Sequence, residues 1–202
     1  MDAFEQLAAD IFWNEGYWVR TGVKVELTRE DKLRIGRPSS PRWEIDLVAY
    51  RPATDELLAL ECKNYLDSGG VHAAHFESGS RYAHRYKLFH DEVLRQTVLD
   101  RLKAQFVERG LCRTEARVKL GLIHAHASAF NAALLADRFT TNGWLLFGPD
   151  WLRTKLSLVA GQGYDNSIAS VVAKILLRNG TSIPSTSMTK VDAGESLDPA
   201  RL

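Results

Sequence analysis

The sequence has little of several things that would define a class of protein. Only two of its 202 residues are cysteines, which is too few for a disulfide framework and typical of a reducing cytoplasm. No apolar run approaches the roughly 20 residues needed to cross a bilayer, so we expect no membrane partner. The stretch MDAFEQLAAD holds two early acids and no basic segment, so we expect no secretory signal there.

An excess of charge of one sign is also missing. The formal net charge is +1, so a polyanion such as nucleic acid would have to be bound by local patches. What is present is 45% hydrophobic and 25% charged residues, the composition of an ordinary globular protein. The length suits one domain with a substantial core.

Hydrophobic periodicity predicts helices that alternate with strands. Helices are expected at residues 3–15, 91–109, 130–139, 150–160 and 166–178. Strands are expected from Tyr17, at 43–50 and 57–63, from Val118 and from Trp144. A polar loop is expected at 28–42 and a partly helical, movable excursion at 66–90. This order indicates an α/β fold with a central mixed sheet over residues 1–178. Residues 179–202 are small, polar and aperiodic, which predicts a flexible tail.

Three ionisable residues interrupt the apolar hairpin WEIDLVAYRPATDELLALECKNY. If RPATDE is a symmetric connection, Asp46 lies opposite Glu61, and Lys63 shares the face of Glu61 because side chains alternate along a strand. Cys62 then points to the opposite side, into the core. Ionised groups in such a place cost several kcal/mol unless they are paired or bind a metal.

Two chemistries explain these residues. Adjacent carboxylates suit Mg²⁺ or Mn²⁺, and a nearby lysine can orient or help to deprotonate a water, as in metal-assisted phosphodiester hydrolysis. Alternatively, Asp46, Glu61 and Lys63 form an ordinary cross-strand ion-pair cluster at a sheet end. The residues by themselves leave both interpretations open.

Asp46 within EIDLVAY, followed fifteen residues later by Glu61-Cys62-Lys63, resembles the motif of the PD-(D/E)xK nuclease superfamily. That motif is an acid on the second core strand, then acid-x-Lys on the third. FEQLAADIFWNEGYWV is similar to the first helix of the family, which carries an acid. The resemblance covers roughly residues 3–125, although Ile45 stands where the family has its leading proline.

The resemblance implies a restriction-endonuclease-like αβββαβ core with a central mixed sheet flanked by helices. It also implies that Asp46, Glu61 and the backbone carbonyl of Cys62 hold Mg²⁺ or Mn²⁺. Lys63 would position or activate the attacking water, and Glu5 would assist the metal shell.

Two further residues carry alternative interpretations. Glu5 forms a capping box with Asp2 in the sequence pattern, a structural role that does not exclude a metal role. Gln96 lies on the polar side of a long helix, where some relatives of the superfamily place a glutamine in the cleft. An exposed helical glutamine is the simpler interpretation.

Two basic stretches offer nucleic-acid contacts, because cations interleaved with aromatic rings suit phosphates and bases. The first includes Arg37 and Arg42, and RYAHRYK supplies Arg81, Arg85 and Lys87. The implied protein is a cytoplasmic, metal-dependent nuclease that cleaves DNA, as an endonuclease of restriction, anti-phage defence or repair.

Alternatives remain open at this point. One is an inactive nucleic-acid-binding or assembly module of the same fold, and another is an RNA-cleaving nuclease. The paired histidines, His72 with His75 and His124 with His126, raise a zinc alternative, although neither cysteine has a CxxC partner. Target specificity would come from loops, from a homodimer or from a partner subunit.

Overall fold

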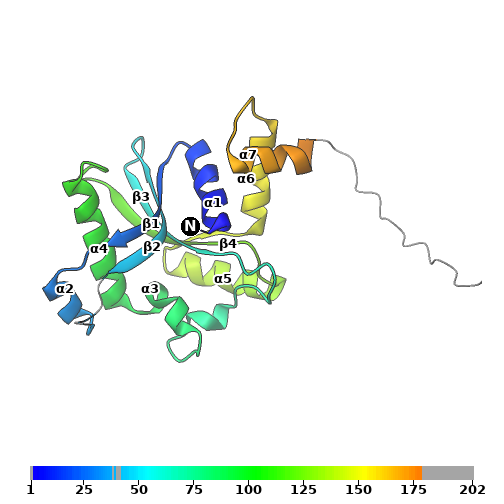
Figure 1. The fold of residues 1–202 in the computed structure, drawn as a ribbon. Coiled ribbons are helices and arrows are strands. Elements are labelled where there is room, and N and C mark those ends of the chain that lie inside the picture. Colours follow the sequence, from blue (N-terminus) through cyan, green and yellow to red (C-terminus); the bar gives the residue numbers. More distant parts are fainter. Residues whose placement is uncertain (1, 38, 40–41, 179–202) are drawn as a thin grey trace, which may run out of the picture.

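A five-stranded mixed sheet forms the centre of the computed structural model, which describes residues 2–37, 39 and 42–178 (Figure 1). Its strands lie side by side in chain order: β1 (Trp18–Val25), β2 (Trp43–Arg51), β3 (Glu56–Lys63), β4 (Arg117–His124) and β5 (Leu145–Phe147). The pairs β1–β2 and β2–β3 are antiparallel, whereas β3–β4 and β4–β5 are parallel. The predicted α/β class with a mixed sheet is therefore confirmed.

Helices cover both faces of the sheet (Figure 1). One face carries α1 (Ala3–Asn14) and α6 (Pro149–Gly161), against which α7 (Ile168–Ala173) packs. The other face carries α3 (Lys87–His90), α4 (Glu92–Glu108) and α5 (Ala129–Thr141). The order α1, β1, β2, β3, α4, β4 follows the predicted succession.

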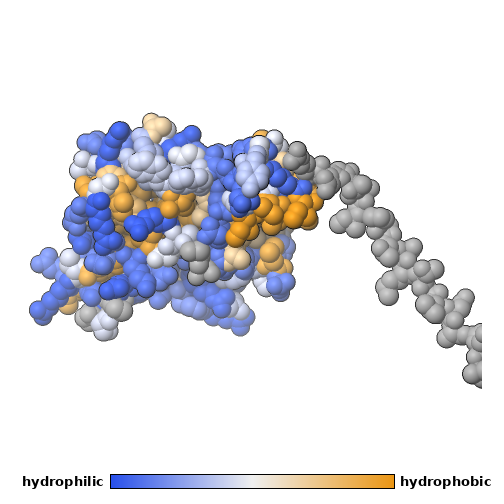
Figure 2. Space-filling model, turned by 45° about the horizontal axis from the view of Figure 1, so that its top comes forward, coloured by the Kyte–Doolittle hydropathy of each residue, from blue (hydrophilic) through white to orange (hydrophobic). Residues whose placement is uncertain are grey.

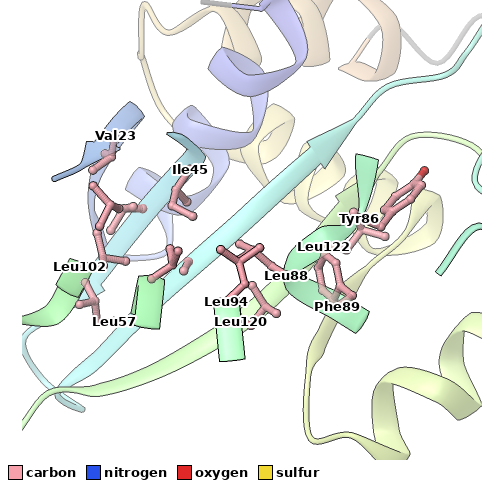
Figure 3. Close-up of a cluster of buried hydrophobic side chains, with 14 of the residues drawn as sticks. Val23, Ile45, Leu57, Tyr86, Leu88, Phe89, Leu94, Leu102, Leu120 and Leu122 are labelled. Atoms are coloured by element: carbon pink, nitrogen blue, oxygen red, sulfur yellow. The ribbon is translucent and has the colours of Figure 1, made fainter. Parts of the chain in front are cut away.

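The larger hydrophobic cluster fills the space between α4 and the sheet (Figure 3). The predicted stripe of α4 is confirmed, because Leu94, Val98 and Leu102 are fully buried. Burying each such side chain contributes roughly 1.5–3 kcal/mol. On the other face, Leu58, Leu60 and Cys62 of β3 pack in the cluster that includes α1, so the predicted inward position of Cys62 is confirmed.

The regular alternation of side chains between the two sides of the sheet is interrupted at Gly22 of β1 and Asp46 of β2. Ile45 and Val48 both pack in the α4-side cluster, whereas Leu47 between them packs on the α1 side. In an unbroken strand, residues three apart face opposite sides, so the alternation is interrupted here. Gly22 has a φ of 58°, and the β1–β2 ladder omits the Gly22–Asp46 pair. This break keeps Asp46 out of both cores.

Two connecting segments differ in part from expectation. The predicted loop 28–42 contains a short helix, α2 (Arg29–Arg34), which begins with a capping box between Thr28 and Asp31. Periodicity missed it because six residues with no buried side chain leave no hydrophobic stripe. The segment 66–90 is partly helical, as predicted, with 3₁₀ turns η1 (Ala73–Phe76) and η2 (Ala83–Arg85) before α3. The predicted tail, 179–202, lies outside the described residues.

Helix α7 turns its small residues inward and its large apolar residues outward. Ala169, Ser170 and Ala173 are buried, and the chain continues as a π-helical turn, Lys174–Arg178. The outward apolar side chains are Ile168, Val171 and Val172 of α7 and Ile175, Leu176 and Leu177 of the turn after it. Figure 2 shows this hydrophobic surface beside the end of the described chain.

None of the described helices is long and apolar enough to span a bilayer.

Candidate active site

The candidate site lies where β2 separates from β3. The β2–β3 ladder runs from Arg51–Glu56 to Leu47–Leu60, which is the register that the symmetric turn predicted. Asp46 and Glu61 come next in that register, beyond the last paired residues. There a side chain takes the place of a main-chain acceptor: Asp46 Oδ2 accepts a hydrogen bond of 2.8 Å from the Cys62 amide.

Lys63 reaches both carboxylates from the last position of β3. Its Nζ lies 3.4 Å from Asp46 Oδ2 and 3.3 Å from Glu61 Oε2. The side chains of Lys63, Asp46 and Glu61 are 17%, 24% and 13% exposed, so the three charges are only partly hydrated. Parallel pairing of Lys63 with His124 of β4 fixes this end of β3 on its other side. The predicted gathering of two carboxylates and one ammonium is confirmed.

Burial and neighbouring charges set the protonation of this cluster. Burial raises the pKa of Glu61 to about 7; Lys63 opposes this rise, and Asp46 adds to it. Burial lowers the pKa of Lys63, but the attraction of Glu61 and Asp46 outweighs burial and leaves it above its ordinary value. At neutral pH, Lys63 is therefore a cation, whereas a large share of Glu61 is protonated.

The raised pKa of Glu61 predicts a specific dependence of stability on pH. The folded protein holds the Glu61 proton up to about pH 7, whereas the unfolded chain releases it near pH 4.5. Stability from this group is therefore lost as pH rises from 4.5 through 7, by about 3 kcal/mol for a shift of this size. In chelator, Glu61→Gln should melt at a higher temperature than the parent at pH 8 and at nearly the same temperature at pH 4.5.

The measurement is the difference in melting temperature between Glu61→Gln and the parent across that pH range. Groups elsewhere titrate equally in both proteins, so they cancel in the difference. Glu44→Gln, a change at an exposed acid of the neighbouring strand β2, serves as the control and should show no such trend. A difference that does not vary with pH would contradict the assigned environment of Glu61.

Glu5 lies at the edge of the cluster, on the first turn of α1. The predicted capping box is present: Asp2 accepts from the Phe4 amide at 2.8 Å, and Glu5 accepts from the Asp2 amide at 3.4 Å. Burial raises the pKa of Glu5, the Asp2 amide lowers it, and the charge of Asp46 raises it further. Glu5 is thus within electrostatic reach of Asp46 while it caps the helix.

The carboxylate and carbonyl oxygens at this site are the type of ligand that a hard cation such as Mg²⁺ prefers. In a strand the N–H and C=O of one residue point to the same side, so the Cys62 carbonyl faces the gap that its amide shares with Asp46. Asp46, Glu61 and this carbonyl could hold Mg²⁺ or Mn²⁺, provided that Lys63 moves from between the carboxylates. Among the described residues, no three Cys, His, Asp or Glu side chains converge to hold a metal.

The predicted basic contacts fall in different places. Arg81 and Arg85 both lie over the Tyr82 ring, 4.5 and 5.5 Å from its centroid, and Arg85 donates to the Tyr65 hydroxyl at 3.4 Å. This brings the 81–87 segment beside the end of β3, two residues past Lys63. Lys87 begins α3 and is half-buried.

The other predicted contacts are less closely tied to the site. Arg37 lies 5.7 Å from the Trp43 ring centroid, and exposed Arg42 directly precedes β2. Gln96 donates to Asp100 one turn along α4 at 2.8 Å, which is the arrangement of an exposed helical glutamine. This favours the simpler interpretation of Gln96.

Sequence patterns gave no signal for the role of Tyr65. Its φ is 40°, a conformation that bulky residues rarely adopt, and the side chain of Asn64 accepts from its amide. The histidines behind the zinc alternative include His72 and His75, whose rings lie with centroids 5.0 Å apart, and the His75 ring also packs on Tyr82 at 4.3 Å. The described residues bring no third Cys, His, Asp or Glu side chain to this pair that would complete a metal site, so the structure does not favour zinc.

Comparison with models of known protein families, with curated proteins and with solved structures finds no match to this chain. The resemblance to the PD-(D/E)xK superfamily therefore depends on the motif and on the order of elements that carries it.

Proposed function

We propose that this protein is a metal-dependent nuclease with a restriction-endonuclease-like fold, acting on DNA as an endonuclease. The observation that carries the proposal is the Lys63 ammonium, 3.3–3.4 Å from two carboxylates at the splayed end of β2 and β3. The order α1, β1, β2, β3, α4, β4 supports it. A role in restriction, anti-phage defence or repair in the cytoplasm is part of the proposal.

Asp46, Glu61 and the Cys62 carbonyl would hold Mg²⁺ or Mn²⁺, with Glu5 assisting through water. A cation bound there would polarise a phosphate oxygen and lower the pKa of a bound water. Because its pKa is raised, Lys63 acts as a charged donor that orients the attacking water and neutralises charge on the phosphate, not as a base.

A second candidate is an inactive nucleic-acid-binding or assembly module in which the three charges only hold the sheet end together. The observation that favours it is that Lys63 already pairs with both acids. A third, cleavage of RNA, uses the same site on another substrate.

One experiment separates these functions. Plasmid, linear duplex, single-stranded DNA and RNA are incubated with the protein, with Mg²⁺, with Mn²⁺ and with chelator, beside Asp46→Asn. Cleavage of DNA that needs metal and Asp46 supports the proposal. Cleavage of RNA alone supports the third candidate, and binding without cleavage supports the second.

Binding should depend on salt more steeply than a net charge of +1 would give. Arg81, Arg85 and Lys87 would neutralise phosphates, so changing all three to alanine should flatten the slope of log affinity against log salt by about 2–3. The measurement is fluorescence anisotropy with labelled DNA in chelator.

The control is Arg153→Ala, an exposed arginine of α6 whose guanidinium pairs with Asp150. It should leave the slope unchanged, and none of these variants should shift the melting temperature by much. An unchanged slope in the triple variant would make 81–87 an ordinary solvated segment.

A partner is expected to supply target specificity, either a second copy or another subunit. The outward apolar side chains of α7 and the turn after it support a protein contact on that side, because monomers rarely expose contiguous apolar surface of this kind.

A further inference from the structure

A pocket of about 210 Å³ opens beside the end of β3, outside the carboxylate cluster. Its lining includes Tyr65, Ser68, His72, His75, Tyr82 and Arg85, together with two glycines. None of the described lining residues is acidic. The pocket is smaller than those that enclose drug-sized ligands, so it can admit no more than the parts of a single nucleotide and excludes a base-paired duplex.

The wall of the pocket is held in place by the sheet and by α5. The Val71 amide donates to the His126 carbonyl at 2.9 Å, next to a bridge between Gly70 and Ala127. Gly70 has a φ of 80°, and a Cβ there would lie 2.7 Å from the His126 carbonyl oxygen. Only glycine permits this approach, which fixes the wall against the extension of β4.

Asn131 of α5 sets the hydrogen-bonding state of His72. The Ala73 amide donates to Asn131 Oδ1 at 3.0 Å, so the Asn131 NH₂ group faces His72 Nδ1 at 3.3 Å and donates to it. Neutral His72 must then carry its proton on Nε2. That nitrogen lies 3.1 Å from where a Cβ on Gly69, another lining residue, would stand. His72 therefore offers an N–H at the pocket.

The adjoining part of the wall joins aromatic faces to a cation. The His75 and Tyr82 rings lie with centroids 4.3 Å apart, and the Arg85 guanidinium lies 5.5 Å from the Tyr82 centroid. Tyr65, in its unusual conformation two residues beyond Lys63, accepts from Arg85 at 3.4 Å. Backbone strain of this kind clusters at ligand sites.

We infer that this pocket receives one unpaired nucleotide of the strand that is cut, its phosphate on Arg85 and His72 and its base or sugar against His75 and Tyr82. The inference rests on the proposed nuclease function. It makes the preferred substrate a nucleic acid with an unpaired nucleotide, because a paired one must first leave its stack.

The test measures binding in chelator, so that cleavage plays no part. A short labelled oligothymidine and a blunt duplex of similar length are titrated with the parent protein and with Arg85→Ala and Tyr82→Ala. The parent should bind the single strand about tenfold tighter than the duplex, and each variant should lose about tenfold on the single strand and much less on the duplex. Thymidine monophosphate in excess should compete with the oligothymidine.

Matched controls come from exposed residues elsewhere. Tyr164→Ala removes a 91% exposed tyrosine, and Arg153→Ala an exposed arginine; neither should change affinity. Arg85 is itself exposed, so its variant should fold even if Tyr82→Ala does not. Tyr82→Phe keeps the ring face and should bind like the parent.

The outcomes separate the two proposals. Equal binding of single strand and duplex, or unchanged binding by Arg85→Ala and Tyr82→Ala, overturns the pocket even where cleavage needs Asp46 and metal. Selective single-strand binding that these variants abolish supports the pocket even if the protein cleaves nothing, in which case the nuclease proposal alone fails.

Discussion

Lys63→Met should lose cleavage by a factor on the order of 10²–10³ while metal binding persists. Methionine keeps most of the apolar stem and removes the charge that lies 3.3–3.4 Å from both carboxylates. The attacking water then loses its donor and the transition state a compensating charge. Asp46 and Glu61 remain, so Mg²⁺ or Mn²⁺ should bind at least as tightly without a competing ammonium.

Three measurements on this variant decide between catalysis and simple charge pairing. They are calorimetric metal titration, thermal melting and a cleavage assay, each beside Lys119→Met, which removes a lysine of β4 that pairs with Glu56. Intact metal binding and lost cleavage support the catalytic role. A large loss of stability, with no metal bound by the parent, would show that Lys63 only neutralises two buried acids.

Asp46→Asn should reduce metal-dependent cleavage to background, and Glu61→Gln should do the same. Each change replaces an anionic ligand with a neutral amide, which binds Mg²⁺ or Mn²⁺ weakly. Asparagine keeps an oxygen that can accept from the Cys62 amide, whose bond to Asp46 is 2.8 Å long. The fold should therefore survive, whereas Asp46→Ala would leave that amide without its partner.

The matched control is again Glu44→Gln, two residues before Asp46 on the same strand and exposed. It should cleave like the parent, since none of the hydrogen bonds and ion pairs that join Asp46, Glu61, Cys62 and Lys63 involves its carboxylate. Metal titration should show weakened binding in both site variants and none of this loss in the control. Cleavage at the parental rate by either Asp46→Asn or Glu61→Gln would remove that residue from the proposed centre.

Much of the fold could be predicted because local patterns agree with the tertiary structure. The stripe of Leu94, Val98 and Leu102 defines α4, and the symmetric connection fixed the hairpin register without any knowledge of neighbours. Helix α2 was missed because its stability comes from its cap and not from burial. The outward apolar residues of α7 were also missed, since a pattern of apolar residues does not say which side of a helix is covered.

The candidate site divides in the same way. Sequence alone determined that Asp46, Glu61 and Lys63 meet, because strand period and turn symmetry are properties of the local chain. Only the tertiary structure decided that Asp46 leaves the ladder to hold the Cys62 amide, since that depends on the break opposite Gly22 in another strand. It alone also decided the pKa of Glu61 and the pocket around Tyr65 and Arg85. Burial and contacts between distant segments arise only when the sheet, α5 and the 66–90 segment pack together.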